Sequence, residues 1–175
     1  MARKVNVIED LNGKKTVFIH DILFKGKRAV NWEEVEKYLR QYVGEFYQIE
    51  DCNKMIYIGS DLPDEYTHSN YTRILKGANA KAKANATQGL PELLKIATNE
   101  VYEDNRKEKH SKDAKYGWYS YDSRFALPVF GDDGEIKRYN VFNVAMLVRH
   151  DENGKYYLYD IMKIKKRNEQ SFPVK

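Results

Sequence analysis

The chain has 175 residues, of which 42% are hydrophobic and 32% are charged, which fits one folded soluble domain rather than a disordered segment. No run of about 18 apolar residues is present and the N-terminus lacks the apolar core of a secretory signal, so we expect a cytoplasmic protein without a membrane partner. The net charge of +4 favours a polyanionic partner but does not require one. One cysteine, Cys52, and four scattered histidines lack zinc-ligand spacing, and we expect no metal and no cofactor.

The first sixty residues predict a hairpin, a helix and a strand. Two apolar segments within residues 4–24 flank LNGKK, whose Asn-Gly pair is typical of a tight hairpin turn. Asn31 can cap a helix over residues 32–42, where apolar side chains recur at helical spacing and acids occupy the first turn. Residues 54–59, KMIYIG, predict a short strand.

Three acids follow this strand in the loop SDLPDEYTHS. Asp61, Asp64 and Glu65 could be interpreted as a metal site, but their spacing does not match an EF-hand loop. Acids immediately before a helix usually cap it or complement its dipole. We therefore favour the capping role over metal binding.

Residues 70–88 are rich in alanine and lysine and predict one helix, which a Gly-Leu-Pro sequence ends. At about 100° per residue, an alanine-rich side opposes a side that carries Arg73, Lys76 and Lys83. That cationic side is either an ordinary solvated face or a surface that follows a phosphate backbone. A second helix is predicted from Pro91 to about residue 112, which places Tyr102, Arg106 and His110 on one face.

The remainder predicts an antiparallel sheet. Residues 117–121, 124–130, 135–149 and 155–164 are β-prone, and GDDG and DENG join the last three segments as hairpin turns. The predicted fold class is α+β, with an N-terminal hairpin and helices followed by a four-stranded antiparallel sheet. We expect a single domain over 1–175, in which 1–60 is an N-terminal αβ extension of a 61–166 core.

Residues 105–130, NRKEKHSKDAKYGWYSYDSRFALPVF, bring together the residue types that metal-free RNA cleavage needs. That reaction requires a base, an acid and cations that stabilise the charged phosphorane. His110 can act as acid or base, Arg124 and Lys112 can bind phosphate, and the tyrosines can donate hydrogen bonds or stack on bases. The alternatives are a solvated histidine at a helix end, a salt bridge from Arg124 to Asp122 or Asp160, and tyrosines that only pack the sheet.

Four sequence segments carry a resemblance to a known group of proteins. They are LPDEYTHSNYT, KAKANATQGLPELLKIATN, the 105–130 segment and YNVFNVAMLVRHDENGKYYLYDIMKIKK, and the resemblance covers roughly residues 56–165. They resemble proteins of phages and mobile elements in Gram-positive bacteria, some of which are grouped with the nuclease superfamily of barnase, EndoU, colicin nucleases and RelE. The resemblance implies a helical part followed by a four-stranded sheet, metal-free RNA cleavage and a bacterial host cell.

The resemblance also implies roles for individual residues. His110 would be the general acid or base, Arg124 and Lys112 would bind phosphate, and Tyr159 would assist from the last strand. This chain has tyrosine where that superfamily commonly has serine or threonine. Further binding residues would be Tyr119, Tyr121, Arg73, Lys76, Lys83 and Asp160.

Three functions are compatible with these expectations. The first is a metal-independent ribonuclease that cleaves RNA by attack of the 2′-hydroxyl, with an immunity protein as a further partner. The second is a non-catalytic phage protein that binds and inhibits a host factor, which the 14 tyrosines favour because tyrosine is enriched at interfaces. The third is nucleic-acid binding without cleavage.

Overall fold

The computed structural model describes residues 4–26 and 29–173, with side chains described up to Arg167. The strands are β1 (Val5–Glu9), β2 (Lys15–Ile19), β3 (Phe46–Ile49), β4 (Lys54–Tyr57), β5 (Thr98–Glu103), β6 (Trp118–Phe130), β7 (Ile136–His150) and β8 (Tyr156–Pro173). The α-helices are α1 (Trp32–Leu39), α2 (Leu62–His68), α3 (Asn70–Ile74), α4 (Gly77–Ala86) and α5 (Leu90–Lys95). Three 3-10 helices cover Arg40–Tyr42 (η1), Thr87–Gly89 (η2) and Glu108–His110 (η3).

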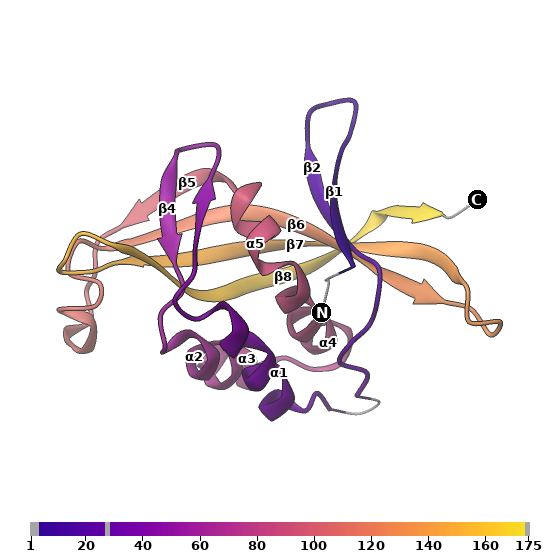
Figure 1. The fold of residues 1–175 in the computed structure, drawn as a ribbon, viewed down its shortest axis with the longest axis horizontal. Coiled ribbons are helices and arrows are strands. Elements are labelled where there is room, and N and C mark those ends of the chain that lie inside the picture. Colours follow the sequence, from indigo (N-terminus) through magenta and orange to yellow (C-terminus); the bar gives the residue numbers. More distant parts are fainter. Residues whose placement is uncertain (1–3, 27–28, 174–175) are drawn as a thin grey trace.

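One mixed sheet of eight strands organises the described chain (Figure 1). The strand order is β1-β2-β6-β7-β8-β4-β3, and β5 also pairs with β6. The long strands β6, β7 and β8 form an antiparallel meander, to which β2 adds in parallel at β6 and β4 adds in parallel at β8. In Figure 1 the helices α1 to α4 lie below the long strands.

The predicted four-stranded antiparallel sheet of the barnase type is wrong. The segments 117–121 and 124–130 are one strand, β6, because Asp122 and Ser123 continue the ladder opposite Ala145 and Val144 instead of forming a turn. The N-terminal segments also contribute strands to the same sheet, and two of the resulting pairings are parallel. The sheet is therefore mixed and eight-stranded, with short helices on one side.

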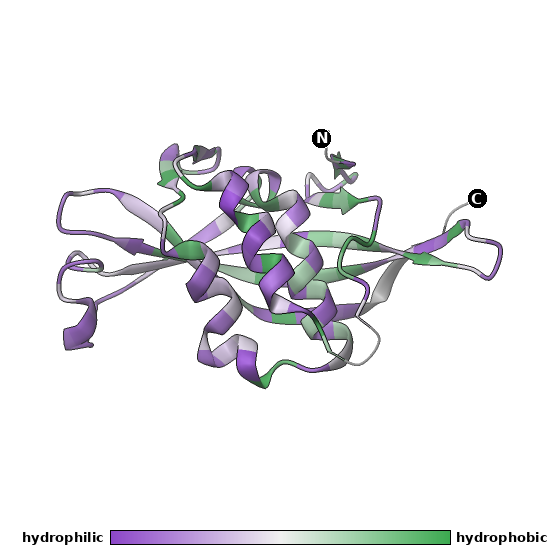
Figure 2. Ribbon diagram, turned by 60° about the horizontal axis from the view of Figure 1, so that its bottom comes forward, coloured by the Kyte–Doolittle hydropathy of each residue, from purple (hydrophilic) through white to green (hydrophobic). Residues whose placement is uncertain are grey.

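The hydrophobic core lies between this sheet and the helices. Its largest cluster joins side chains of the helices, such as Leu39 and Leu93, to side chains of the long strands, such as Phe125, Met146 and Ile161. Figure 2 shows hydrophobic residues along the middle of the strands beneath the helices, and mostly hydrophilic residues in the part of the chain that projects on the left of the view. Polar side chains therefore gather at that end of the long strands.

The N-terminal predictions are largely confirmed. β1 and β2 form the predicted hairpin, although only Gly13 of its Asn-Gly pair has a positive φ, at 80°. α1 and η1 cover the predicted helix 32–42, and Asn31 caps it through a hydrogen bond from the Glu34 backbone N–H, at 3.4 Å. β4 covers residues 54–57 of the predicted strand 54–59.

The predicted helix 70–88 is interrupted. α3 ends at Ile74, Lys76 is extended, and Gly77 begins α4 with a φ of 59°. A positive φ such as that of Gly77 is a backbone conformation that favours glycine. The break rotates α4 relative to α3, so one face assignment cannot hold for both segments.

The predicted helix from Pro91 to residue 112 is wrong beyond Lys95. Thr98–Glu103 forms β5, which pairs with β6 through Thr98↔Asp122 and Val101↔Ser120. Threonine, valine and tyrosine favour strands, and their pairing with β6 outweighs the local helical pattern.

No helix among the described residues combines the length and the apolar character needed to cross a bilayer.

Candidate functional site

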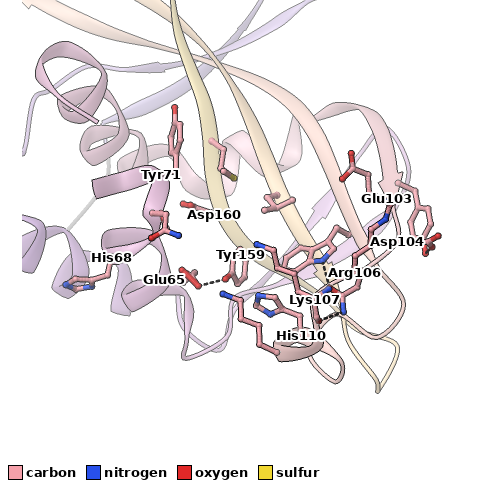
Figure 3. A pocket seen from close by; sticks show the side chains of 18 residues that line it. Glu65, His68, Tyr71, Glu103, Asp104, Arg106, Lys107, His110, Tyr159 and Asp160 are labelled. Carbon is pink, nitrogen blue, oxygen red and sulfur yellow. Dashed lines mark hydrogen bonds between the residues drawn. The ribbon is translucent and has the colours of Figure 1, made fainter. Parts of the chain in front are cut away.

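A groove with a volume of about 830 Å³ lies beside the projecting ends of β6, β7 and β8 (Figure 3). One wall is formed by α2 and the start of α3, and the other by the segment 102–110 that leads from β5 to η3. Strand residues form the floor: Trp118 from β6, Leu147 from β7, and Tyr159, Asp160 and Met162 from β8. Three regions that are distant in sequence therefore meet at one site.

Three aromatic rings pack edge to face in this groove. The His110 ring lies 5.0 Å from Trp118 and 5.5 Å from Tyr159, measured between centroids, and the Trp118 and Tyr159 rings are 4.9 Å apart. Interplanar angles of 76° to 89° bring ring edges onto ring faces, which is a favourable arrangement for aromatic pairs. The packing fixes the position of the imidazole relative to the floor.

His110 is also oriented by a carboxylate. Its Nδ1 lies 3.0 Å from both carboxylate oxygens of Asp113, and its side chain is only 11% exposed. It is therefore not a solvated histidine at a helix end. A carboxylate on Nδ1 holds the proton there and leaves Nε2 as the nitrogen that can accept or donate a proton.

Tyr159 contributes a positioned hydroxyl, which it donates to Glu65 of α2, as Figure 3 shows. Burial and the neighbouring Glu65 carboxylate raise the pKa of Tyr159 well above its ordinary value. The phenol therefore stays protonated at neutral pH. A hydroxyl held in this way can serve as a hydrogen-bonding group but not as an anionic base.

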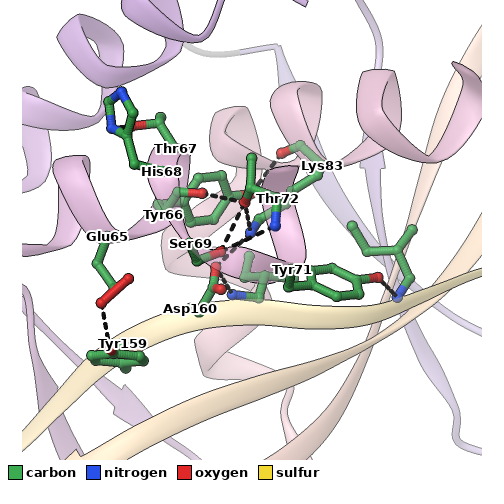
Figure 4. Close-up of polar contacts among 12 residues, drawn as sticks. Glu65, Tyr66, Thr67, His68, Ser69, Tyr71, Thr72, Lys83, Tyr159 and Asp160 are labelled. Carbon is green, nitrogen blue, oxygen red and sulfur yellow. Dashed lines mark hydrogen bonds and ion pairs between the residues drawn. The ribbon is translucent and has the colours of Figure 1, made fainter. Parts of the chain in front are cut away.

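Asp160 borders the groove but belongs to a closed ion pair (Figure 4). Its Oδ1 lies 2.6 Å from Lys83 Nζ, and both side chains are at most 2% exposed. Burial lowers the pKa of Lys83 and raises that of Asp160, while their mutual attraction opposes both shifts. The prediction that Lys83 faces outward is wrong, and neither side chain is free to bind a ligand.

The segment 102–110 places three cations along one wall: Arg106, Lys107 and Lys109. Asn105 fixes this segment to the floor, because its Oδ1 accepts hydrogen bonds from Trp118 Nε1 and from the Lys107 backbone N–H, each at 3.2 Å. The opposite wall contributes neutral donors and acceptors together with Glu65. The 102–110 wall also carries Glu103 and Asp104, so these five side chains give the wall a net charge of +1. The groove thus has one mildly basic wall and an aromatic floor.

Arg124 does not reach the groove. It lies six positions beyond Trp118 on β6, about 20 Å away at a rise of about 3.3 Å per residue, and it lines a different pocket. The alternative, a salt bridge from Arg124 to Asp122 or Asp160, is absent from the described residues, and Arg124 Nε donates to Thr16 Oγ1 at 2.9 Å. Lys112 is exposed and outside the groove lining. Of the four predicted catalytic residues, His110 and Tyr159 meet, whereas Arg124 and Lys112 lie elsewhere.

The other predicted binding residues also lie outside the groove. Tyr119 and Tyr121 alternate with Trp118 along β6 and so point to the other face of the sheet. Tyr121 is 1% exposed and donates its hydroxyl to Glu100 at 2.7 Å, and Lys54 Nζ lies 3.9 Å from the Tyr119 ring centroid. Arg73 and Lys76 are exposed but do not line the groove.

Sequence reasoning missed Asp113, Glu65 and the basic wall. Asp113 follows His110 by three residues, a spacing that places two side chains near each other in a helical turn and could have indicated the pair. Glu65 had been considered together with Asp61 and Asp64, but the three carboxylates engage different partners, namely Tyr159, Arg149 and His68. Within the described residues, no three histidine, cysteine or carboxylate side chains gather in a way that could hold a metal ion.

The chain was compared with models of known protein families, with curated proteins and with solved structures. None of them matches. The chemistry of the groove therefore provides the basis for inferring a function.

Proposed function

We propose that the groove binds single-stranded RNA and cleaves it without a metal, by attack of a 2′-hydroxyl on the adjacent phosphate. The observation that carries this proposal is the His110–Asp113 pair, held against Trp118 and Tyr159 beside a basic wall. The proposal does not depend on a barnase-like fold. It is compatible with the expected origin in a phage or mobile element, for which such an enzyme would act as an effector.

The reaction assigns distinct tasks to the residues of the groove. Nε2 of neutral His110 removes the 2′-hydroxyl proton, the 2′ oxygen bonds to phosphorus, and the bond from phosphorus to the 5′ oxygen breaks. Asp113 stabilises the imidazolium that forms. The ammonium groups of Lys107 and Lys109 balance the charge of the phosphorane and can return a proton to the leaving 5′ oxygen.

The walls of the groove suit a single strand better than a duplex. The cations along the 106–109 segment can follow a phosphate backbone, and an indole or phenol ring provides a surface on which an unpaired base can stack. A volume of about 830 Å³ is sufficient for a few nucleotides but not for a double helix.

The test is cleavage of labelled single-stranded RNA in the presence of EDTA. The wild-type protein should cleave it, and His110→Ala should lose most of the activity, since general acid–base catalysis contributes roughly 10²- to 10⁴-fold. His150→Ala is the matched control, because His150 lies outside the groove, and should retain activity. Intact RNA with the wild-type protein, or equal rates for both variants, would contradict the proposal.

A non-catalytic role in binding a host protein is the second candidate. It is favoured by a patch of tyrosines that extends outward from the groove wall. Tyr102 of that wall and Tyr116 are 49% and 46% exposed, and Tyr119 contacts Tyr102. Exposed tyrosines are common in protein interfaces. A host protein captured by the wild type and by His110→Ala, but not by Tyr116→Ser, would favour this role.

RNA binding that weakens steeply with salt and yields no products would instead indicate binding without cleavage.

A further inference from the structure

The pocket around Arg124 has an unusual electrostatic composition, and neither catalysis nor packing accounts for it. We call it the Arg124 pocket; its volume is about 650 Å³, and it opens where the β1–β2 hairpin and β5 approach the same edge of β6. β5 pairs with β6 up to Asp122, and β2 pairs with it from Phe125 onward. Arg124 therefore lies at the gap between two neighbouring strands.

Arg124 is mostly buried, and its terminal nitrogens open into the pocket without a hydrogen-bond acceptor among the described residues. The residue is 9% exposed, and its Nε donates to Thr16 Oγ1. Among the described side chains, neither terminal nitrogen of Arg124 has a hydrogen-bond acceptor. Within the described residues the four N–H groups of these terminal nitrogens thus have no acceptor, and they open into the pocket instead of being sealed from solvent.

The nearest carboxylate compensates this charge only weakly. Asp10 Oδ2 lies 4.0 Å from Arg124 Nη2, which is beyond hydrogen-bonding distance. Oδ1 of the same carboxylate already accepts the backbone N–H groups of Asn12 and Lys14, each at 2.9 Å. Asp10 is therefore held in the hairpin turn and is not available as a close partner for Arg124.

A second guanidinium faces the same pocket. Arg167 of β8 lines it, and no described side chain forms an ion pair or hydrogen bond with Arg167. Burial lowers the pKa of Arg124, and the charge of Arg167 lowers it further. Two like charges are thus brought together, an arrangement that an anion between them would stabilise.

Asn143 completes the polar surface. In the strand register it lies directly opposite Arg124 on β6 and opposite Lys165 on β8, so it occupies the row between two cationic strand positions. Its side-chain amide lines the pocket and forms no hydrogen bond within the described residues. An amide can donate to an oxyanion that the two arginines also contact.

We propose that the Arg124 pocket binds the phosphate group of a phosphate monoester, held by Arg124, Arg167 and Asn143. The site is separate from the groove and adds a ligand-binding function to the proposed cleavage. Arginine forks match the geometry of phosphate oxygens and can contact two of them at once.

The two guanidinium groups, rather than the other charges of the pocket, favour a compact dianion over a carboxylate. Lys14, Lys15 and Lys95 also line it, and its acids are Glu9, Glu50, Asp51 and Asp122. Asp122 is already engaged by Asn99 Nδ2 at 2.9 Å. A phosphate monoester carries about −1.5 to −2 charges at neutral pH, which balances two guanidinium groups more fully than a carboxylate does.

Calorimetric titration of the full chain with inorganic phosphate tests the proposal, with acetate at equal ionic strength as the comparison. We expect saturable binding of phosphate and none of acetate. Arg167→Gln should raise the dissociation constant about tenfold, the loss expected for a charge-assisted hydrogen-bonding partner. Lys137→Gln, which removes the same charge from an exposed site on β7 outside the pocket, should leave the constant unchanged.

Arg124→Gln should weaken binding further, and a thermal unfolding curve shows whether that variant is folded. If Arg124→Gln does not fold, the result for Arg167→Gln alone still tests the proposal. Comparing 5′-phosphorylated with 5′-hydroxyl oligonucleotides distinguishes the end of a nucleic acid from a free small molecule as the source of the phosphate. Absence of saturable phosphate binding, or equal affinity in wild type and Arg167→Gln, would overturn the proposal. RNA cleavage should be unchanged in Arg167→Gln, so the two proposals fail independently.

Discussion

Lys83 and Asp160 form an ion pair that is closed off from water between α4 and β8. Removing one partner leaves the other charge buried without compensation, so Lys83→Met should lower the free energy of unfolding by roughly 3–5 kcal/mol. Urea denaturation followed by circular dichroism measures this change.

The double variant Lys83→Met, Asp160→Leu provides the control. It removes both charges, and it should recover most of the lost stability because an apolar pair of similar volume is often equivalent to a buried ion pair. If Lys83→Met is as stable as the wild type, leaving Asp160 without its partner costs no stability, which would contradict the prediction.

Glu100 of β5, which contacts Tyr121 of β6, makes a pH-dependent contribution to the stability of the fold. Partial burial alone would raise its pKa, but hydrogen bonds from Lys54 and Tyr121, each at 2.7 Å, outweigh burial and lower the pKa below the ordinary 4.5. A carboxyl whose pKa is lowered by folding stabilises the native state above pH 4.5 and loses that contribution as the pH falls through the lowered value.

Glu100→Gln should therefore be less stable than the wild type at neutral pH by about 1 kcal/mol, since the pair is partly exposed and screened. The difference should shrink as the pH falls below 4.5 and through the lowered pKa, where the wild-type carboxyl becomes protonated. Urea titrations at neutral and acidic pH measure it. A difference that stays constant with pH would contradict the assignment of the ion pair.

At the residue scale, two residues singled out before the structure, His110 and Tyr159, do meet in the groove, whereas Lys83 was assigned to the wrong environment. The helical wheel predicted an exposed lysine because alanine and lysine alternate without a visible break near Gly77. The buried acid that stabilises Lys83 lies on β8, far along the chain. The burial of Lys83 could therefore be recognised only from the packing of α4 against β8.

At the scale of elements, the turn that leads into β6 depends on Gly117. Its φ is 98°, and an added Cβ would lie 2.5 Å from Tyr102 Cε1 and 2.7 Å from the Glu103 carbonyl oxygen. Gly117→Ala should therefore destabilise by more than the roughly 1–2 kcal/mol that a left-handed conformation alone costs, and it should displace the 102–110 wall of the groove.

Gly134 is the matched control for this change. It has a similar φ of 80°, but a Cβ there would meet no atom within 4 Å. Gly134→Ala should show only the conformational cost of about 1–2 kcal/mol. Equal losses for both variants, measured by thermal or urea unfolding, would contradict the close contact at Gly117.

Elements with local signals were predictable, and elements that depend on distant partners were not. The Asn31 cap and the spacing of apolar residues were sufficient for α1, and the Asn-Gly pair was sufficient for the first hairpin. β5 had a helical pattern in sequence, yet it pairs with the start of β6. Such pairing is a property of the tertiary structure, which overrides weak local preference.

At the scale of the whole molecule, two parallel pairings create the architecture. β2 joins β6 and β4 joins β8, so strands from the first sixty residues flank a meander formed by the last sixty. Neither pairing has a sequence signal. The sequence therefore suggested a smaller sheet in one part of the chain.

The same long-range assembly forms the groove. Glu65 comes from α2, His110 from η3 and Tyr159 from β8. Their residue types indicated RNA chemistry, but their proximity follows from the packing of α2 beside β8 and from the path of the 102–110 segment (Figure 3). The same assembly separates Arg124 from His110 and leaves it with a pocket of its own.

The most direct test of the central proposal is the mass of the RNA fragments formed in EDTA by the wild-type protein and by Asp113→Asn. Attack by a 2′-hydroxyl predicts a fragment that ends in a 2′,3′-cyclic phosphate, no cleavage at a position carrying a 2′-deoxy sugar, and slower cleavage by Asp113→Asn. Intact RNA, or fragments that end in a 3′-hydroxyl, would contradict it.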